Sequence, residues 1–372
     1  MYLAVCSDIA SFKNDKLRDR QWSSRFPGSG WITCLYDLAA ESNIEVSSGD
    51  VAIANIASKK WDAKDVYIIQ DMTSSEAARL LDMGGRPFLI TCFEGPLYAP
   101  VFHDSIAHVA KAFQFSLGFG FSDDQRVEDG RTTNLPFRFP SYYLDDVQAI
   151  RPWGSRRKMV LVAANKYKTN RVFIPGKLTI ANVLAQLKSL GRQFISPAYR
   201  NALAASLHGV RLEAIKHFVS RKELWLYGAG WNRWDGLPAA WGTVLRDLVN
   251  GQYLGQCPNK LEVLSGYRFS ICFENMVLPG YVTEKIVDCF VAGTVPLYCG
   301  APDIEMFVPA GSFVDIRAYN SFDQVDGCLD SMNECDAMHI ICAGREYLKT
   351  EMGMLHSYEG FARNVIRLAT SC

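Results

Sequence analysis

One stretch decides the fold of this chain: residues 267–315 read YRFSICFENMVLPGYVTEKIVDCFVAGTVPLYCGAPDIEMFVPAGSFVD. Its opening residues, 267–273, are apolar and aromatic enough for a buried strand, and a polar loop follows. A helix is predicted to begin near Thr283, which can cap it, and to end at Gly293. Residues 295–298 then form a second short apolar strand. A right-handed crossover makes the two strands parallel.

The start of this predicted helix is a site for anions. Unpaired N–H groups and the positive end of the helix dipole meet there, at the carboxyl edge of the sheet. Lys285 lies in the first turn, where a cation is unfavourable unless an anion is nearby. From spacing alone, a phosphate ligand and a surface ion pair with the adjacent Glu284 explain Lys285 about equally well.

The order of short motifs in this stretch resembles a known family. The strings FEN, GYVTEK, VPLYCGAPDI and FVPAGSFVDI follow one another as in the donor-binding signature of the α1,3/4-fucosyltransferases of glycosyltransferase family 10, in particular the bacterial members. This resemblance implies an α/β fold of the GT-B type, with two Rossmann-like domains facing each other across a cleft. It also implies that the donor is GDP-fucose.

The same resemblance implies roles for residues of the motifs. Lys285 and the N–H groups at the helix start stabilise the charge on the donor diphosphate, and Glu284 hydrogen-bonds the sugar part. The implied donor-binding residues of this segment are Glu274, Asn275, Tyr281, Thr283, Glu284 and Lys285.

A basic residue from an earlier helix completes the implied donor site. A strand near residues 159–164, a helix RLEAIKHFV and a strand ending in YG follow the family's order. This implies that Arg211 contacts the donor diphosphate. An apparent basic insertion near residues 166–210 precedes that helix, which leaves Arg200 as the alternative donor arginine.

Residues 1 to about 150 alternate strand-like and helix-like runs, which predicts an α/β domain with a mainly parallel sheet. The strand candidates are residues 2–6, 51–56, 66–69, 87–92 and 113–119. Glu94 follows the fourth candidate, at the sheet edge where open α/β sheets bind ligands, although position alone favours an ordinary turn carboxylate. The strings CFEGP, FSLGFGFSDD and PFRFPSYYLDD resemble the bacterial fucosyltransferases, and this implies that Glu94 is the general base.

Proline, glycine and basic residues concentrate between residues 136 and 158, which marks a domain boundary. We therefore expect one domain over 1–150 and another over 151–340, and the resemblance implies that the first binds the acceptor and the second binds GDP-fucose. Residues 341–372 are helical by pattern. Whether they cross back to the first domain, as the final helix of GT-B enzymes does, stays open.

The charge balance argues against a nucleic-acid partner, because Lys plus Arg and Asp plus Glu both total 39. Residues 147–212 nevertheless contain no acidic residue and include an amphipathic helix over 176–191, with Ile180, Val183, Leu184, Leu187 and Leu190 on one face. Two interpretations remain open. The cations form a landing surface for an anionic or lipid-linked acceptor or a membrane, or they are solvated and pair with acids elsewhere.

The cysteines and the hydrophobic pattern indicate the cellular compartment of the protein, and its motifs bear on whether it binds a metal. Eleven cysteines are scattered without a CxxC pair, which indicates a reducing compartment and no structural zinc. No run of eighteen apolar residues occurs, so we expect a cytoplasmic protein with, at most, peripheral contact at the inner membrane face. No Asp-x-Asp motif is present, so we expect donor binding without a metal or another cofactor.

The function implied by the resemblance is transfer of L-fucose from GDP-β-L-fucose to a glycan, in an α1,3 or α1,4 linkage to GlcNAc or Glc. Inversion at the sugar carbon needs one in-line displacement, a base and stabilisation of the leaving diphosphate. Two alternatives stay open: transfer of another GDP-linked sugar, and a non-catalytic glycan-binding protein on the same fold.

Overall fold

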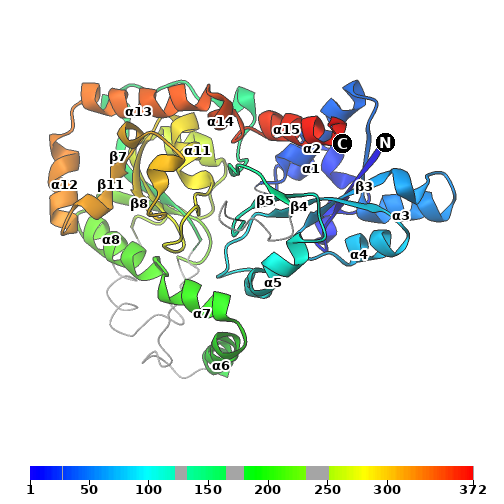
Figure 1. Cartoon of the computed structure of the whole chain (residues 1–372). Helices are drawn as coiled ribbons and strands as arrows, with labels where there is room; N and C mark the ends of the chain where they lie inside the picture. Colours follow the sequence, from blue (N-terminus) through cyan, green and yellow to red (C-terminus); the bar gives the residue numbers. More distant parts are fainter. Residues whose placement is uncertain (27, 122–131, 165–179, 232–250, 372) are drawn as a thin grey trace. The chain divides into compact units, whose positions relative to one another are not determined.

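The computed structural model describes residues 1–26, 28–121, 132–164, 180–231 and 251–371. Figure 1 shows two α/β units, one built from residues 1–145 together with 350–372 and the other from residues 146–349. Each unit has its own parallel sheet and its own hydrophobic core. The predicted α/β class with two parallel sheets is therefore confirmed.

The sheet of the first unit has the strand order β2-β1-β3-β4-β5-β6 among the described residues, and every strand pair is parallel. Its strands are β1 (Tyr2–Cys6), β2 (Glu45–Ser48), β3 (Val66–Asp71), β4 (Arg86–Cys92), β5 (Phe115–Gly118) and β6 (Thr133–Asn134). Because β2 and β3 pair with opposite edges of β1, the order reverses there, and ligands bind α/β sheets at such reversal points.

Alternate residues of β1 point to opposite faces of this sheet. Leu3 and Val5 belong to the core under α2 and α15, whereas Ala4 and Cys6 belong to the core under α3, α4 and α5. The helices of this unit are α1 (Arg20–Ser23), α2 (Gly30–Glu41), α3 (Gly49–Ala57), α4 (Ser75–Asp82), α5 (Pro100–Ala110), α14 (Glu351–Met354) and α15 (Tyr358–Thr370).

The predicted strand over residues 51–56 is wrong, because these residues lie in helix α3. Ser48 adopts the extended backbone of an N-cap before Gly49, and the buried side chains of Ala52 and Ile53 face the sheet. The β-branched residues suggested a strand, but their apolar spacing also fits a helix. The strand of this region is the shorter run before it, β2.

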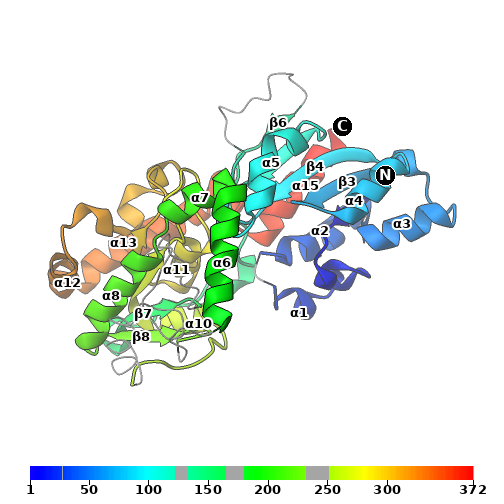
Figure 2. The ribbon, with the colours of Figure 1, turned by 90° about the horizontal axis from the view of Figure 1, so that it is seen from below.

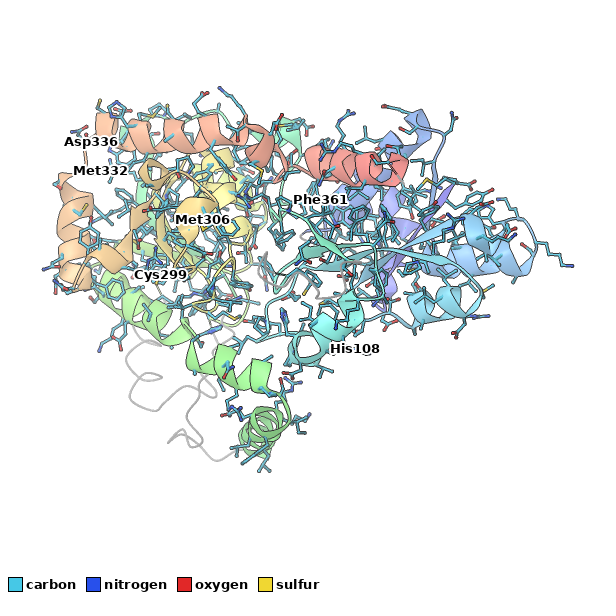
Figure 3. The ribbon with its side chains drawn as sticks, viewed as in Figure 1. His108, Cys299, Met306, Met332, Asp336 and Phe361 are labelled. Atoms are coloured by element: carbon cyan, nitrogen blue, oxygen red, sulfur yellow. The ribbon has the colours of Figure 1, made fainter. Side chains whose placement is uncertain are left out.

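Helix α15 packs on α2 in the first unit, as Figures 1 and 2 show from two directions. Phe361, labelled on α15 in Figure 3, lies with its ring 5.1 Å from that of Trp31. Val365 and Ile366 join the same core. Residues 350–372 thus complete the core begun by the first strands.

The sheet of the second unit has the order β11-β10-β9-β7-β8 among the described residues, again with parallel pairs. Its strands are β7 (Arg157–Val162), β8 (Leu224–Tyr227), β9 (Tyr267–Phe273), β10 (Val295–Cys299) and β11 (Val314–Asp315). Its helices are α6 (Ile180–Ile195), α7 (Pro197–Ala204), α8 (His208–Ser220), α10 (Lys260–Ser265), α11 (Glu284–Ala292), α12 (Phe322–Ser331) and α13 (Glu334–Leu348). The predicted strand, helix and parallel strand over 267–298 are confirmed as β9, α11 and β10.

The basic insertion is described only in part, because residues 165–179 lie outside the described residues. Helix α6 confirms the predicted helix, which Figure 2 shows beside α7. Leu187, placed by the prediction on the apolar face, is exposed, as are Phe194 and Ile195. The side chains of Ile180, Val183 and Leu184 lie outside the described part. Within the described residues, no helix combines the length and apolar character required to cross a membrane.

Two glycines of the second unit should respond to alanine in opposite ways. Gly293 ends α11 at φ 71°, and an added Cβ would lie 3.0 Å from Nη2 of Arg345, so Gly293→Ala should lower the free energy of unfolding by about 1–2 kcal/mol. Gly327 is exposed inside α12 with open space around it, so Gly327→Ala should raise that energy by up to about 1 kcal/mol. Urea denaturation midpoints measure both, and equal shifts would contradict this account of α11.

Candidate functional site

The candidate donor site lies at the carboxyl end of β9, where the strand order of the second sheet reverses. Glu274 follows β9 directly and is fully buried. Its Oε1 accepts a hydrogen bond from the backbone N–H of Thr283 (2.8 Å), and its Oε2 accepts one from the Thr283 hydroxyl (2.8 Å). The end of the strand is thereby tied to the start of α11.

Lys285 completes this buried cluster. Its Nζ lies 3.0 Å from Oε2 of Glu274 and 2.8 Å from Oγ1 of Thr283. The two carboxylates Glu274 and Glu284 together raise the pKa of the Lys285 ammonium, although burial acts in the opposite direction. Lys285 is therefore charged at neutral pH.

Two sequence-based interpretations of this helix start need correction. The nearest carboxylate partner of Lys285 is Glu274 rather than the adjacent Glu284, whose Oε1 is 3.8 Å away. Thr283 is the N-cap residue of α11, but its side chain makes no capping hydrogen bond, because its hydroxyl is bonded to Glu274. The Thr283 side chain therefore does not cap the first N–H groups of α11.

Glu284 is half-buried at the start of α11, between two lysines. Its Oε1 lies 3.4 Å from Nζ of Lys260, which also pairs with Asp288 at 2.5 Å. Burial alone raises the pKa of Glu284, but the Lys285 and Lys260 ammonium groups outweigh it and lower that pKa to about 2. Glu284 is thus an ionised hydrogen-bond acceptor at neutral pH.

Arg211 reaches the same strand end from α8. Its Nη2 donates to the carbonyl oxygens of Phe273 (2.7 Å) and Glu274 (3.1 Å) and to Oδ1 of Asn275 (3.3 Å). Arg211 is buried, and it lies in the first turn of a helix that begins three residues earlier than its predicted start. Arg200, the alternative donor arginine, is exposed on α7, and no contact links it to this cluster within the described residues.

Tyr281 lies in the loop between β9 and α11, and Asp303, which follows β10, holds that loop by hydrogen bonds. Tyr281 is buried just before the helix. The carboxylate of Asp303 accepts from the backbone N–H of Gly280 with both oxygens at 3.0 Å. Sequence reasoning missed Asp303 and Lys260, because such contacts join segments whose proximity no local pattern reveals.

Glu94 lies in the first unit, just beyond β4, and is exposed. Its backbone carbonyl lies 2.8 Å from Nε2 of His103 and accepts from Sγ of Cys92 at 3.3 Å. A carbonyl only accepts hydrogen bonds, so Nε2 of His103 carries the hydrogen, and burial lowers the pKa of that imidazole. A neutral histidine on α5 thus fixes the backbone that presents Glu94.

A second carboxyl group near Glu94 was missed from the sequence. Asp71 is the last residue of β3, and it lines the same cavity of about 240 Å³ as Glu94. The signal was present, because VYIIQD is an apolar strand ending in an acid, the pattern that drew attention to Glu94.

One acidic group in the described residues has the spacing of a metal site, formed by Glu223, Asp326 and Asp330. The ammonium of Lys158 lies among these carboxylates, at 2.9, 2.9 and 2.6 Å respectively. The cation that this cluster binds is therefore a lysine of the same chain.

The two parallel sheets and the helices on their faces match the GT-B fold found in glycosyltransferases. The whole chain superimposes on the Anabaena protein HepE, solved with UDP and glucose, over 100% of both chains (TM-score 0.56, 8% identity). It also superimposes on an α1,3-fucosyltransferase solved with GDP-fucose, over 100% of this chain and 89% of that one (TM-score 0.50, 14% identity). At these identities the likeness is one of fold.

The family follows from the second unit. Residues 215–340 match the model of glycosyltransferase family 10 (fucosyltransferase), C-terminal region. A stretch of 66 residues is 44% identical to the α-(1,3)-fucosyltransferase FucT of Helicobacter pylori, covering 18% of this chain and 14% of that protein's length. Residues 215–340 therefore belong to glycosyltransferase family 10, which confirms the resemblance of the motifs.

The Glu274 cluster should dominate the stability of the second unit. Glu274→Gln leaves the Lys285 ammonium without its nearest carboxylate, so the free energy of unfolding should fall by about 3–5 kcal/mol. Glu305→Gln replaces an exposed glutamate of the same unit and should change it by less than about 0.5 kcal/mol. Chemical denaturation monitored by circular dichroism compares the two, and similar midpoints would contradict the structural role of Glu274.

Proposed function

We propose that this protein is an inverting α-fucosyltransferase that moves L-fucose from GDP-β-L-fucose to a hydroxyl group of a glycan. The observation that carries the proposal is that the Glu274–Thr283–Lys285 cluster lies inside the family 10 segment, residues 215–340. The H. pylori relative is an α1,3-fucosyltransferase, and the fucosyltransferase with a similar fold was solved with GDP-fucose.

In this proposal the start of α11 holds the donor diphosphate. A lysine ammonium has three N–H donors, and those of Lys285 have two hydrogen-bond acceptors within the described residues, Glu274 and Thr283. Its third donor and the N–H groups at the uncapped helix start are then available to phosphate oxygens. Arg211 adds a positive charge beside Asn275. Ionised Glu284 accepts hydrogen bonds from sugar hydroxyls.

Glu94 is the proposed general base. Its carboxylate takes the proton of the acceptor hydroxyl while the acceptor oxygen bonds to the anomeric carbon of fucose. The bond from that carbon to the phosphate oxygen breaks, and GDP leaves with the bonding electrons. The acceptor is a glycan joined through an α1,3 or α1,4 linkage to GlcNAc or Glc, and the reaction takes place on the cytoplasmic side.

No divalent ion is required by this arrangement. Lys285, Arg211 and the helix dipole act where the charge on the leaving diphosphate develops, which is the role that a metal fills in many glycosyl transfers. Preorganised donors of this kind stabilise a leaving group without moving during the reaction.

Removing the proposed base should separate chemistry from donor binding. Glu94→Gln cannot accept the hydroxyl proton, so kcat with an acceptor should fall about 10²-fold or more while the Kd for GDP-fucose stays unchanged. Glu41→Gln, an exposed glutamate on α2 of the same unit, serves as the control and should keep normal turnover. Near-normal kcat in Glu94→Gln would refute the assignment.

Donor binding should depend on Lys285 and not on metal. Calorimetric titration in EDTA should give wild-type affinity for GDP-fucose, whereas Lys285→Ala should raise the Kd tenfold or more by removing a charge-assisted phosphate contact. The double variant Glu274→Gln/Lys285→Gln avoids leaving a buried carboxylate alone and should show the same loss. Lys349→Ala, an exposed lysine paired with Glu346, is the control. Loss of wild-type binding in EDTA, or unchanged binding in both Lys285 variants, would contradict the proposal.

A further inference from the structure

The first unit contains a cavity of about 240 Å³ at the carboxyl edge of its sheet. It lies at the place where the strand order reverses around β1, the position at which open α/β sheets bind ligands. Its lining comes from β1, β3, β4 and α2 and from the segments that follow the three strands, and it includes Val5, Trp31, Ile69, Asp71, Phe93 and Glu94. A single water occupies roughly 30 Å³ in the liquid, so the cavity is large enough for a ring-sized ligand.

Asp71 stands out in this lining because half of its carboxyl group is unsatisfied. Its Oδ2 accepts a hydrogen bond from the Ser7 hydroxyl at 3.3 Å. Its Oδ1 is shielded from solvent and has no hydrogen-bond partner among the described residues. A buried acceptor without a partner is destabilising, so such atoms in native proteins call for an explanation.

The groups around Asp71 do not compensate its charge. Within the described residues Asp71 takes part in no ion pair, and the titratable groups that face it are Glu94 and Cys92, both from the β4 end. Burial raises the pKa of the Cys92 thiol, which therefore stays neutral. Burial also raises the pKa of Asp71 to about 7, and the Glu94 carboxylate acts in the same direction.

The cavity selects the chemistry of its ligand. Two carboxyl groups at one edge repel phosphates and carboxylates, whereas most of the lining is apolar or aromatic, as at Phe93 and Ile69. A ligand that fits offers a hydroxyl donor to the carboxyl group of Asp71 and an apolar face to the rest. An uncharged sugar ring has both features.

We propose that Asp71 is an acceptor-binding residue, whose carboxyl group accepts a hydrogen bond from a hydroxyl group of an uncharged sugar ring that occupies the cavity beside Glu94. The identification of this sugar as the acceptor rests on the proposed fucosyl transfer. The binding of a sugar to the cavity is independent of that proposal. Any lipid or anionic part of the acceptor then lies outside this cavity.

Steady-state kinetics with GDP-fucose and two probe acceptors, N-acetyllactosamine and lactose, test the proposal. Asp71→Asn replaces a carboxylate by a neutral amide and should raise the KM for the acceptor sugar about tenfold. Asp71→Ala should raise this KM further. The KM for GDP-fucose should not change in either variant. Asp65→Asn, an exposed aspartate just before β3, is the matched control. An acceptor KM unchanged in Asp71→Ala would overturn the proposal.

The pH dependence provides a second readout. Because the ionised form accepts the stronger hydrogen bond, the wild-type acceptor KM should fall as the pH rises from 6 to 8, and that of Asp71→Asn should stay flat. Equal slopes in the two proteins would overturn the role of Asp71.

Stability separates a binding role from a structural one. The pKa of Asp71 in the folded state, about 7, exceeds the unfolded value of about 3.9, so its contribution to stability is lost as the pH rises through 7. Asp71→Asn should therefore raise Tm, and more at pH 8 than at pH 5. A lower Tm at both pH values together with an unchanged acceptor KM would identify Asp71 as a structural residue.

Direct binding distinguishes failure of this inference from failure of the proposed transfer. Saturation-transfer NMR of N-acetyllactosamine and lactose with the full chain and GDP reports binding without turnover. A sugar signal that wild type shows and Asp71→Ala lacks supports the inference, whether or not wild type transfers fucose. If wild type binds the sugar but transfers no fucose, only the proposed function is refuted. No signal with wild type for either sugar, or an equal signal in Asp71→Ala, would refute the inference.

Discussion

The second unit depends on one buried carboxylate. Glu274 is completely removed from solvent. Two hydrogen bonds from Thr283 and the ammonium group of Lys285 stabilise its buried carboxylate. Burying a charge is unfavourable unless such partners are present, so the three residues must come together for the sheet to close over them. The same contacts fix the beginning of α11 against the end of β9. The geometry of the helix start is therefore a consequence of satisfying one acid.

The two units use the same sheet plan with different consequences at its edge. In each unit the third strand lies next to the first, on the side opposite the second, and an acid stands at its carboxyl end: Asp71 ends β3, and Glu274 follows β9. Glu274 is satisfied by its own chain, which fixes the start of α11, the proposed site of the donor diphosphate. Asp71 has one oxygen without a partner in the described residues, and it is the proposed contact for a sugar hydroxyl. Topology sets the position of these acids, and the neighbouring side chains set their chemistry.

Local patterns predicted β9, α11 and β10, because the apolar strand residues, the helix N-cap and the glycine that ends the helix all lie within one short segment of sequence. They failed for α3, where β-branched residues mimic a strand although their spacing fits a helix. They also failed for the partner of Lys285, because Glu284 is adjacent in sequence whereas Glu274 becomes adjacent only when the loop folds back. Asp71 is a different case: an apolar strand that ends in an acid marked its position in the sequence, whereas its unsatisfied oxygen is a property of packing, which no spacing rule records.

The placement of α15 has a consequence for synthesis on the ribosome. Residues 146–349 form a continuous unit that can fold as soon as it has emerged, whereas the core of the first unit needs Phe361 and its neighbours. Domains generally fold as they are made, N-terminal first. Here α2, which is translated early, lacks its packing partner α15 until residues 350–372 have been made, so the core of the first unit is completed last although its strands come first.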